Sequence, residues 1–553
     1  MFLRRTTRFA SRFGAIALPV LAVCVHVGCG DDEPSREGRD TPDGSTLQDG
    51  GPGDDGSMST DDASPDGSAT ESAPFDWVGI IGTGQSLSVG ATAGVVSTKQ
   101  PFSNGRLIDT GADPKYPLTG GAPKFAITPL IEPGREKSKG TGPGYTDGQY
   151  PNNIAGETPH SGMANEISAL FLARTTRDYL TLHSVVGWSG HPLVDINKAG
   201  GARAYPASLM EARALKDLAK AAGKTFGYGA IILTHGESDA GNKDYNAGIK
   251  QLVKDYNVDL KAITGQTRDV YLLVSQQSVF GAMTGSAVQV WKAGVEDPLI
   301  VCTGPKYQYM YSVDHLHFPA TGYRSLGEKY GEVFDLVVNQ GKKWKPVQPT
   351  AATRTGANVV VSFDVPNPPL EWDYSLDLPH QTKNTAWKNG RGFEAWDAAK
   401  KPLTIASVAI SSANTVTITL AAAPAGPVTI GYAAAQDGTN EEGTGNNGGL
   451  ATGYRGQLRD SDTLVGYDAE KVTAKVTKGS AAVTLTGGTK LVSHSERDVA
   501  TTPGGPANWI IKAVASPTSF TLSAPWGGAD AEVTLDVHHD LHNYGVHSFV
   551  VTN

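Results

Sequence analysis

Between residues 75 and 345, short apolar runs alternate with longer stretches whose apolar residues recur at helical spacing. The apolar runs predict strands at 77–81, 182–186, 229–233, 270–274 and 299–302. The stretches between them predict helices at 163–180, 207–222, 245–263, 287–295 and 321–339. Strands that are apolar throughout are buried on both faces, and strand–helix alternation is typical of parallel sheets. We therefore expect an α/β domain over residues 75–345, with helices on both faces of a parallel sheet.

One stretch of this domain, residues 97–160, breaks the alternation. It is rich in Gly, Pro and Tyr and shows little periodicity. A loop of this length inside a compact domain is usually functional. We expect it to run over the edge of the sheet and to help wall the site.

After residue 345, helical signals almost vanish and short alternating runs predict strands at 358–363, 407–410, 415–420 and 428–432. This pattern is typical of a β-sandwich, which we place at residues 346–464. Within it, residues 436–453 are rich in Gly and Asn and predict a loop. A second β-rich module at 465–540 is expected to be an insertion, because residues 541–553 are suited to form the closing strand of the sandwich.

The first 29 residues have the features of a bacterial lipoprotein signal peptide. A basic start precedes an apolar run at 13–27, which is shorter than the roughly 20 residues needed to span a bilayer. The run ends in Gly28-Cys29, which resembles a lipobox, whose cysteine is acylated and becomes the new N-terminus. We expect lipidation at Cys29. Plain secretion with cleavage nearby is the alternative.

Residues 30–74 consist mostly of Asp, Gly, Ser, Pro and Thr, and they cannot bury enough apolar surface to fold. We expect a disordered acidic linker that holds most of the negative charge behind the chain's net −9. The rest of the chain is nearly neutral and lacks the clustered Lys and Arg of a nucleic-acid surface. A flexible linker that follows Cys29 predicts a lipid-anchored, extracytoplasmic protein of the bacterial cell envelope. We therefore expect the membrane as a partner and expect no binding to nucleic acid.

The chain has 3 cysteines. With Cys24 in the signal peptide and Cys29 lipidated, Cys302 stands alone in an apolar run, where a buried structural thiol is expected. The sequence therefore predicts neither a disulfide framework nor a cysteine-based metal site.

The first predicted strand ends in Gly84-Gln85-Ser86, a serine placed directly after a glycine turn. Open α/β folds place their reactive groups at the carboxyl ends of the strands. Ser86 is therefore our candidate nucleophile. A serine hydroxyl also needs a base, a group that orients the base, and donors for an oxyanion.

Asp314 and His317 lie three residues apart, just ahead of the last predicted helix. In a turn, this spacing lets the carboxylate reach the imidazole Nδ1–H and leaves Nε2 to take a proton from a serine. His315 is the competing base, but its adjacency to Asp314 makes the same geometry harder. The alternative is a capping aspartate beside ordinary loop histidines.

Two further strand ends carry small or polar residues. After 229–233 comes the run Thr234-His235-Gly236-Glu237-Ser238-Asp239. After 182–186, Gly190 is suited to offer an unobstructed backbone N–H. Since parallel strands end at one edge of the sheet, we expect these turns to meet Ser86 and the Asp–His pair.

These residues together resemble the SGNH hydrolases, most closely their carbohydrate O-acetylesterase branch, which includes sialate O-acetylesterases and acetylxylan esterases. The similar motifs are Gly84-Gln85-Ser86, the Gly-Glu-Ser-Asp block at 236–239, and Asp314-x-x-His317. The resemblance implies a three-layer α/β/α, flavodoxin-like domain that needs no metal or cofactor. It implies Ser86 as nucleophile, His317 as base and Asp314 as its orienting partner. The oxyanion donors would be the Ser86 and Gly190 amides, with Gln85, Gly236 and Glu237 in supporting positions.

Two positions depart from the family pattern. Leu87 stands where an Asn often follows the serine, and His235 stands where a Gln usually supplies a third oxyanion donor. A histidine can donate there only in the right tautomer. For Glu237 and Asp239, internal hydrogen bonds that rigidify the turn are favoured over direct chemistry.

The expected function is that of an extracytoplasmic serine esterase that removes O-acetyl groups from a carbohydrate through an acyl-enzyme. One alternative is a non-catalytic glycan-binding lipoprotein whose β modules do the binding. The other is a lipase or thioesterase of the wider SGNH group. The Gly-Gln-Ser block favours the sugar branch, because the lipolytic branch usually has Gly-Asp-Ser.

Overall fold

The computed structural model describes residues 73–109, 125–135, 148–281, 283–374, 378–379, 389–434, 448, 455–488, 499–501 and 508–553. The expected signal peptide, the lipidation site Cys29 and the acidic linker lie outside these residues, apart from the end of the linker. Most of the expected loop at 436–453 does as well. In the described part of the chain, no helix is both long and apolar enough to cross a membrane.

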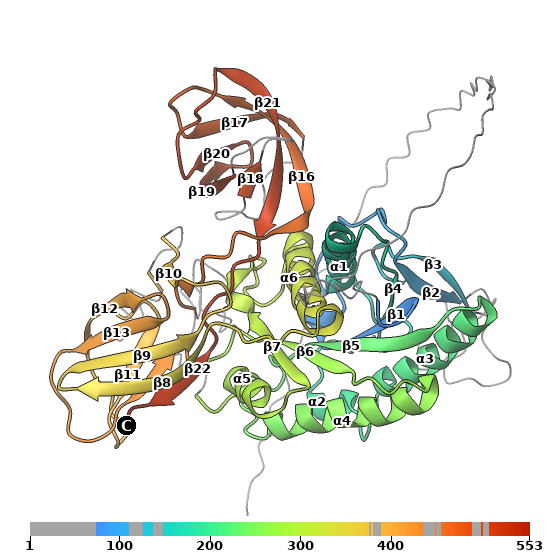
Figure 1. The fold of residues 1–553 in the computed structure, drawn as a ribbon, viewed down its shortest axis with the longest axis horizontal. Coiled ribbons are helices and arrows are strands. Elements are labelled where there is room, and N and C mark those ends of the chain that lie inside the picture. The colour runs from blue at the N-terminus through green and yellow to red at the C-terminus, as the bar shows by residue number, and fades with distance from the viewer. Residues whose placement is uncertain are drawn as a thin grey trace, which may run out of the picture. The chain divides into compact units, whose positions relative to one another are not determined.

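A seven-stranded sheet organises the first domain, in the order β3-β2-β4-β1-β5-β6-β7 (Figure 1). The five strands predicted from apolar runs are confirmed. They are parallel: β1 (Trp77–Gly84), β4 (Thr181–Val185), β5 (Phe226–Thr234), β6 (Tyr271–Gln276) and β7 (Ile300–Pro305). Their carboxyl ends therefore meet at one edge of the sheet.

The stretch at 97–160 differs from its prediction as a loop excursion. It contains β2 (Gly105–Asp109), parallel to β4, and β3 (Phe125–Pro129), antiparallel to β2. These two strands extend one side of the sheet. Their short sequences carry little periodicity, because strands at a sheet edge are set by pairing with a neighbour as much as by their own pattern.

The five predicted helices are confirmed, with one short addition, α2 (Leu193–Ile196). α1 (Pro159–Thr175) starts ahead of its predicted position because the Thr158 hydroxyl accepts a hydrogen bond from the His160 N–H. It stops early because Thr176 adopts a left-handed φ of 57°. The others are α3 (Ala204–Ala221), α4 (Tyr245–Thr264), α5 (Ser286–Glu296) and α6 (Ala320–Phe334), which continues as a π-helical turn, Asp335–Asn339.

An apolar core covers each face of the central strands. On one face, Ile81 and Leu233 pack in a cluster with side chains of α3 and α4. On the other face, Ile80 and Ile232 pack with side chains of α1 and α6. Neighbouring residues of a strand point to opposite faces, so β1 and β5 supply both cores. Figure 1 shows α1 and α6 on one side of the sheet and α3 and α4 on the other.

Antiparallel sheets follow the α/β domain. Four strands pair in the order β12-β13-β9-β8: β8 (Gln348–Thr355), β9 (Asn358–Asp364), β12 (Ile405–Ser412) and β13 (Thr415–Leu420). Three more pair as β11-β14-β22: β11 (Phe393–Trp396), β14 (Thr429–Tyr432) and β22 (Ser548–Val551). Both sheets contribute to one core, through residues such as Val361 and Ile430. A two-stranded sheet joins β10 (Glu371–Trp372) to β15 (Leu458–Arg459).

A closed barrel lies in the chain between β15 and β22. Its strands are β16 (Val465–Val476), β17 (Ala482–Gly488), β18 (Val499–Thr501), β19 (Asn508–Ser516), β20 (Ser519–Leu522) and β21 (Ala531–Asp540). After the barrel, β22 returns to pair antiparallel with β14. The fold is thus a mixed α/β structure with one mostly parallel sheet and several antiparallel sheets.

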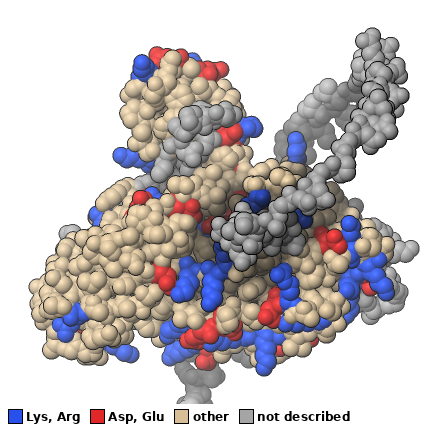
Figure 2. Space-filling view, viewed as in Figure 1, with Lys and Arg blue, Asp and Glu red and all other residues tan. Residues whose placement is uncertain are grey.

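Charges are unevenly spread over the face that Figure 2 shows. Lys and Arg lie among Asp and Glu over much of the α/β domain, whereas the surface of the β8–β14 region is largely uncharged. Cys302 is buried as predicted, and this burial raises the pKa of its thiol to about 12. Cys302 is therefore a structural residue of the core.

Candidate active site

Ser86 follows β1 on a tight turn. Gly84 has a φ of 139°, and a Cβ there would lie 2.2 Å from the Thr234 carbonyl oxygen at the end of β5. Only glycine allows this approach. Ser86 then opens a 3₁₀ helix, Ser86–Ser88, and the residue is 6% exposed. The predicted nucleophile thus stands at the carboxyl edge of the sheet.

Gln85 links two of the strand ends. Its side-chain oxygen accepts a hydrogen bond of 2.9 Å from the Ser238 N–H, in the turn after β5. Its backbone N–H donates to the Thr234 carbonyl at 3.3 Å. Gln85 therefore ties the turn that carries Ser86 to the turn after β5.

Asp314 and His317 lie together in the loop between β7 and α6. His317 Nδ1 is 2.6 Å from Asp314 Oδ2, while Asp314 Oδ1 accepts the backbone N–H groups of Leu316 and His317. Partial burial alone would raise the pKa of Asp314, but these hydrogen bonds outweigh it and lower the pKa. The carboxylate thus faces an Nδ1–H, and His317 Nε2 has no hydrogen-bond partner among the described residues.

The competing histidine, His315, is held differently. Its backbone is in the left-handed region, with a φ of 51°. Its Nδ1 is 3.1 Å from the carbonyl oxygen of Gly448. Because a carbonyl only accepts, this nitrogen carries the proton. Gly448 belongs to the part of the chain that forms the antiparallel sheets, the described residues within 346–464 and 541–553, which we call the β region. His317, rather than His315, has the Asp314-facing Nδ1 that the base requires.

The turn after β4 packs directly on the turn that carries Ser86. The Trp188 N–H donates to the Gly84 carbonyl at 2.9 Å. A Cβ on Gly187 would lie 2.0 Å from Ser88 Oγ, so glycine is needed there. From the stretch at 97–160, Asn153 Nδ2 donates to the Gly187 carbonyl at 3.0 Å and holds this turn. The strand end that carries Gly190 is therefore anchored beside Ser86.

Two backbone amides at this edge are available as donors. Gly190 has a φ of 80° and open space where a side chain would start. Ser86 is the first residue of its 3₁₀ helix, a position whose N–H has no partner within the helix. Within the described part of the chain, neither amide donates to a backbone carbonyl.

His235, predicted as a third oxyanion donor, has other partners here. Its Nε2 is 3.0 Å from the His191 carbonyl and its Nδ1 is 2.9 Å from the Tyr245 hydroxyl. The carbonyl requires a proton on Nε2, so Nδ1 accepts from the tyrosine and no N–H is left for an oxyanion. The residue is fully buried, and burial lowers its pKa. His235 instead ties the turn after β5 to His191, the neighbour of Gly190.

The carboxylates of the Gly236–Asp239 turn bond to other parts of the chain and thereby hold the turn in place. Glu237 Oε1 pairs with Lys306 Nζ at 2.7 Å, and both side chains are buried. Asp239 Oδ2 accepts the Leu193 N–H at 2.7 Å, at the start of α2. Gly236 has a φ of 126°, which a residue with a side chain rarely adopts.

Sequence reasoning missed two buried partners at this edge, Lys306 and Tyr245. Burial lowers the pKa of Lys306, although Glu237 favours its charged form. A lysine directly after the apolar strand β7 is the signal that points to such a buried pair. Tyr245 gives no such signal, since an aromatic residue at a helix start is ordinary core composition.

Leu87, the other departure from the family pattern, packs into the core. It is fully buried, in the same apolar cluster as Phe318 and Tyr323. Phe318 follows His317 in the chain, and Tyr323 lies on α6. The Tyr323 hydroxyl donates to the Ala91 carbonyl at 2.9 Å. These contacts link the segment after Ser86 to the segment after His317.

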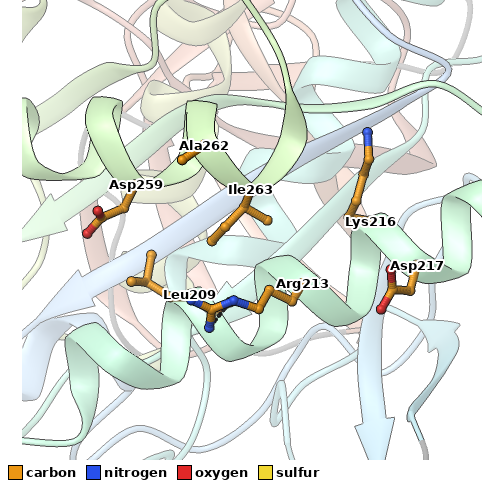
Figure 3. A pocket seen from close by; sticks show the side chains of 7 residues that line it. All are labelled: Leu209, Arg213, Lys216, Asp217, Asp259, Ala262 and Ile263. Carbon is orange, nitrogen blue, oxygen red and sulfur yellow. Dashed lines mark hydrogen bonds between the residues drawn. The ribbon is translucent and has the colours of Figure 1, made fainter.

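A cavity of about 520 Å³ lies elsewhere, between α3 and α4 (Figure 3). Two of its charged lining groups already have protein partners, Lys216 with the Thr264 carbonyl and Asp259 with Lys198. Neither Ser86 nor His317 lines it. This groove is therefore distinct from the candidate active site.

No protein-family model and no curated protein matches the chain. A solved carbohydrate acetylesterase from Xanthomonas citri is similar over 70% of this chain and 81% of its own, with 12% identity and a TM-score of 0.40. NanS is similar over 47% and 97%, with 12% identity and a TM-score of 0.32. A carbohydrate acetylesterase from Sinorhizobium meliloti is similar over 47% and 98%, with 12% identity and a TM-score of 0.26. These values are too low to transfer residues or an activity to this chain.

Proposed function

We propose that this protein is an extracytoplasmic serine esterase that removes O-acetyl groups from a carbohydrate. One observation carries the proposal. His317 Nδ1 is 2.6 Å from Asp314 Oδ2, and Nε2 has no partner among the described residues. An imidazole oriented in this way is a general base for a serine, and Ser86 follows β1 at the sheet edge that His317 is expected to share.

The proposed reaction has two steps. Ser86 Oγ attacks the acetyl carbonyl carbon and passes its proton to His317 Nε2. The Ser86 and Gly190 amides stabilise the tetrahedral oxyanion. The bond to the sugar oxygen then breaks, and His317 returns the proton to that oxygen, which leaves an acetyl-serine and the free alcohol. Water, deprotonated by His317, attacks the acetyl-serine and releases acetate while Ser86 regains its proton.

The substrate class and location rest on the sequence. Gly84-Gln85-Ser86 and Gly236–Asp239 resemble the carbohydrate O-acetylesterase branch of the SGNH hydrolases. We assign the α/β domain to the three-layer architecture of that family and the two facing antiparallel sheets to a β-sandwich. We further propose that acylation of Cys29 anchors the protein to the cell envelope and that the acidic linker spaces the domains from the membrane.

Hydrolysis of p-nitrophenyl acetate by the full chain tests the proposal. Ser86→Ala is expected to lower kcat by about 10⁴-fold or more. Ser238→Ala is the matched control, because it removes an exposed hydroxyl at the same edge and keeps the backbone N–H that Gln85 accepts. Activity retained in Ser86→Ala would exclude Ser86 as the nucleophile.

Two further measurements separate the alternatives. A preference for long acyl chains over acetyl would indicate a lipase or thioesterase of the same group. Glycan binding without any Ser86-dependent hydrolysis would indicate a non-catalytic binding protein. An O-acetylated sugar that loses acetate to the wild type and not to Ser86→Ala would establish the proposed reaction.

A further inference from the structure

Gly448 contacts the loop that carries the Asp–His pair. It lies between β14 and β15, outside the α/β domain. Its N–H donates to the His315 carbonyl at 2.9 Å, and its carbonyl accepts from His315 Nδ1 at 3.1 Å. One residue of the β region thus binds both the backbone and the side chain of a residue that lies between Asp314 and His317.

The loop depends on such support, because it belongs to no helix or strand. Its internal backbone bonds run from the Ser312 N–H to the His317 carbonyl and from the His315 N–H to the Ser312 carbonyl. The Asp314 carboxylate adds bonds from the two backbone N–H groups that follow His315, and none of these bonds holds the His315 side chain. His315 itself adopts a φ of 51°, a conformation that costs free energy for a non-glycine residue and persists when its surroundings hold it. Val313 is 93% exposed, so this side of the loop contributes no packing.

The fit at Gly448 leaves no room for a side chain. A Cβ there would lie 2.3 Å from the Tyr311 ring and 2.5 Å from the His315 carbonyl oxygen. The Tyr311 ring packs edge-on against Phe318, with centroids 4.7 Å apart, and Phe318 directly follows His317. The Gly448 backbone is outside the left-handed region, so an alanine is excluded by its neighbours and not by its own φ.

The β region is also docked on the same edge of the sheet at a second point. His547 is fully buried, its backbone exchanges two hydrogen bonds with the Gln276 side chain, and its Nε2 is 2.7 Å from Ser278 Oγ. Gln276 ends β6. On its other side, His547 Nδ1 donates to the Ala433 carbonyl, just after β14, at 2.6 Å. The β region is therefore held against the α/β domain by specific polar contacts.

We propose that the β region completes the active site, with Gly448 as a positioning residue. Gly448 holds His315, and through it the loop, so that Asp314 and His317 keep the geometry that proton transfer needs. This inference rests on the proposed esterase function. It assigns the β region a part in catalysis in addition to any part in binding.

The test compares Gly448→Ala with the wild type in the full chain, on p-nitrophenyl acetate. A displacement of the base by about 1 Å costs up to about 10²-fold in rate. We expect kcat to fall by about 10- to 10²-fold with KM nearly unchanged, because the small substrate does not touch Gly448. Gly527→Ala is the matched control, since a Cβ there meets nothing within 4 Å. A folded Gly448→Ala protein with wild-type kcat would overturn the proposal.

A second pair of variants decides the question if Gly448→Ala does not fold. Asparagine tolerates the left-handed region and its amide is placed to replace His315 Nδ1 as a donor. We expect His315→Ala to lose kcat as Gly448→Ala does, and His315→Asn to recover most of it. Wild-type kcat in His315→Ala would overturn the proposal. Wild-type activity that persists in Ser86→Ala would overturn the esterase function itself, and with it this role of Gly448.

Discussion

Two regions at the carboxyl edge of the sheet carry the same residue types at similar spacing and put them to different use. In the loop before α6, His317 Nδ1 lies 2.6 Å from Asp314, and the His317 side chain is 14% exposed. In the turn after β5, His235 Nδ1 lies 3.8 Å from Asp239 and the His235 side chain is fully buried. Both pairs are local in sequence, and both follow an apolar strand.

The difference lies in the second nitrogen of each imidazole. His235 Nε2 donates to the His191 carbonyl, whereas His317 Nε2 has no partner among the described residues. A base needs a nitrogen that is free to take a proton, and a structural histidine needs both nitrogens satisfied because it is buried. This difference supports the proposed role of His317 as the base and gives His235 a structural role.

The largest expected effect is that of His317→Ala. Loss of the base should lower kcat on p-nitrophenyl acetate by about 10⁴- to 10⁶-fold, because the serine then has no group to take its proton. The melting temperature should change little, since among the described residues the His317 side chain bonds only to Asp314 of its own loop. If His235→Phe instead caused the greater loss of kcat, the assignment of the two histidines would be reversed.

Asp314→Asn should have the next largest effect, a loss of about 10³- to 10⁴-fold in kcat. The asparagine oxygen can keep the two backbone N–H groups that Oδ1 accepts. Its amide would then face His317 Nδ1 as a donor, which places the imidazole proton on Nε2 and blocks the base. Asp239→Asn serves as the matched control. Equal losses in the two variants would contradict the comparison.

His235→Phe should mainly affect stability. The ring still stacks on Tyr245, but the Tyr245 hydroxyl and the His191 carbonyl lose their partner. We expect the free energy of unfolding in urea to fall by about 1–3 kcal/mol. The loss of kcat should be about 10-fold or less, because the turn at Gly190 loosens while His317 is untouched.

The smallest expected effect is on how the difference in the free energy of unfolding between the wild type and His235→Phe changes with pH. Burial lowers the pKa of His235 below its ordinary 6.5, so the unfolded chain binds a proton more readily than the native protein. The contribution of His235 to the stability of the native protein is complete above pH 6.5 and is lost as the pH falls below that value. The difference in the free energy of unfolding between the wild type and His235→Phe should therefore narrow, by up to about 1.4 kcal/mol for each pH unit below 6.5.

Urea unfolding at pH 7.5 and pH 5.5 measures this change. Other buried histidines contribute equally to both proteins and cancel, among them His160 and His547, whose pKa values burial lowers to about 3 and about 4. If this difference in the free energy of unfolding were the same at both pH values, His235 would take up no extra proton on unfolding. Its neutral state in the native protein would then need another explanation.

The sequence by itself determined what depends on near neighbours. The apolar runs predicted β1, β4, β5, β6 and β7, because a strand that is buried on both faces is apolar at consecutive residues. The three-residue spacing of Asp314 and His317 predicted their contact, because a single turn brings them together.

Only the tertiary structure decided what depends on residues far apart in the chain. The partners of His235 include the His191 carbonyl, and His315 is held by Gly448, 133 residues away. The pair of Lys306 and Glu237 and the edge strands β2 and β3 arise in the same way. Such contacts form when separate elements pack together. A local sequence pattern therefore does not show which imidazole nitrogen of a histidine is left without a partner. The sequence could therefore propose His235 for the oxyanion, and only packing could give it a structural role.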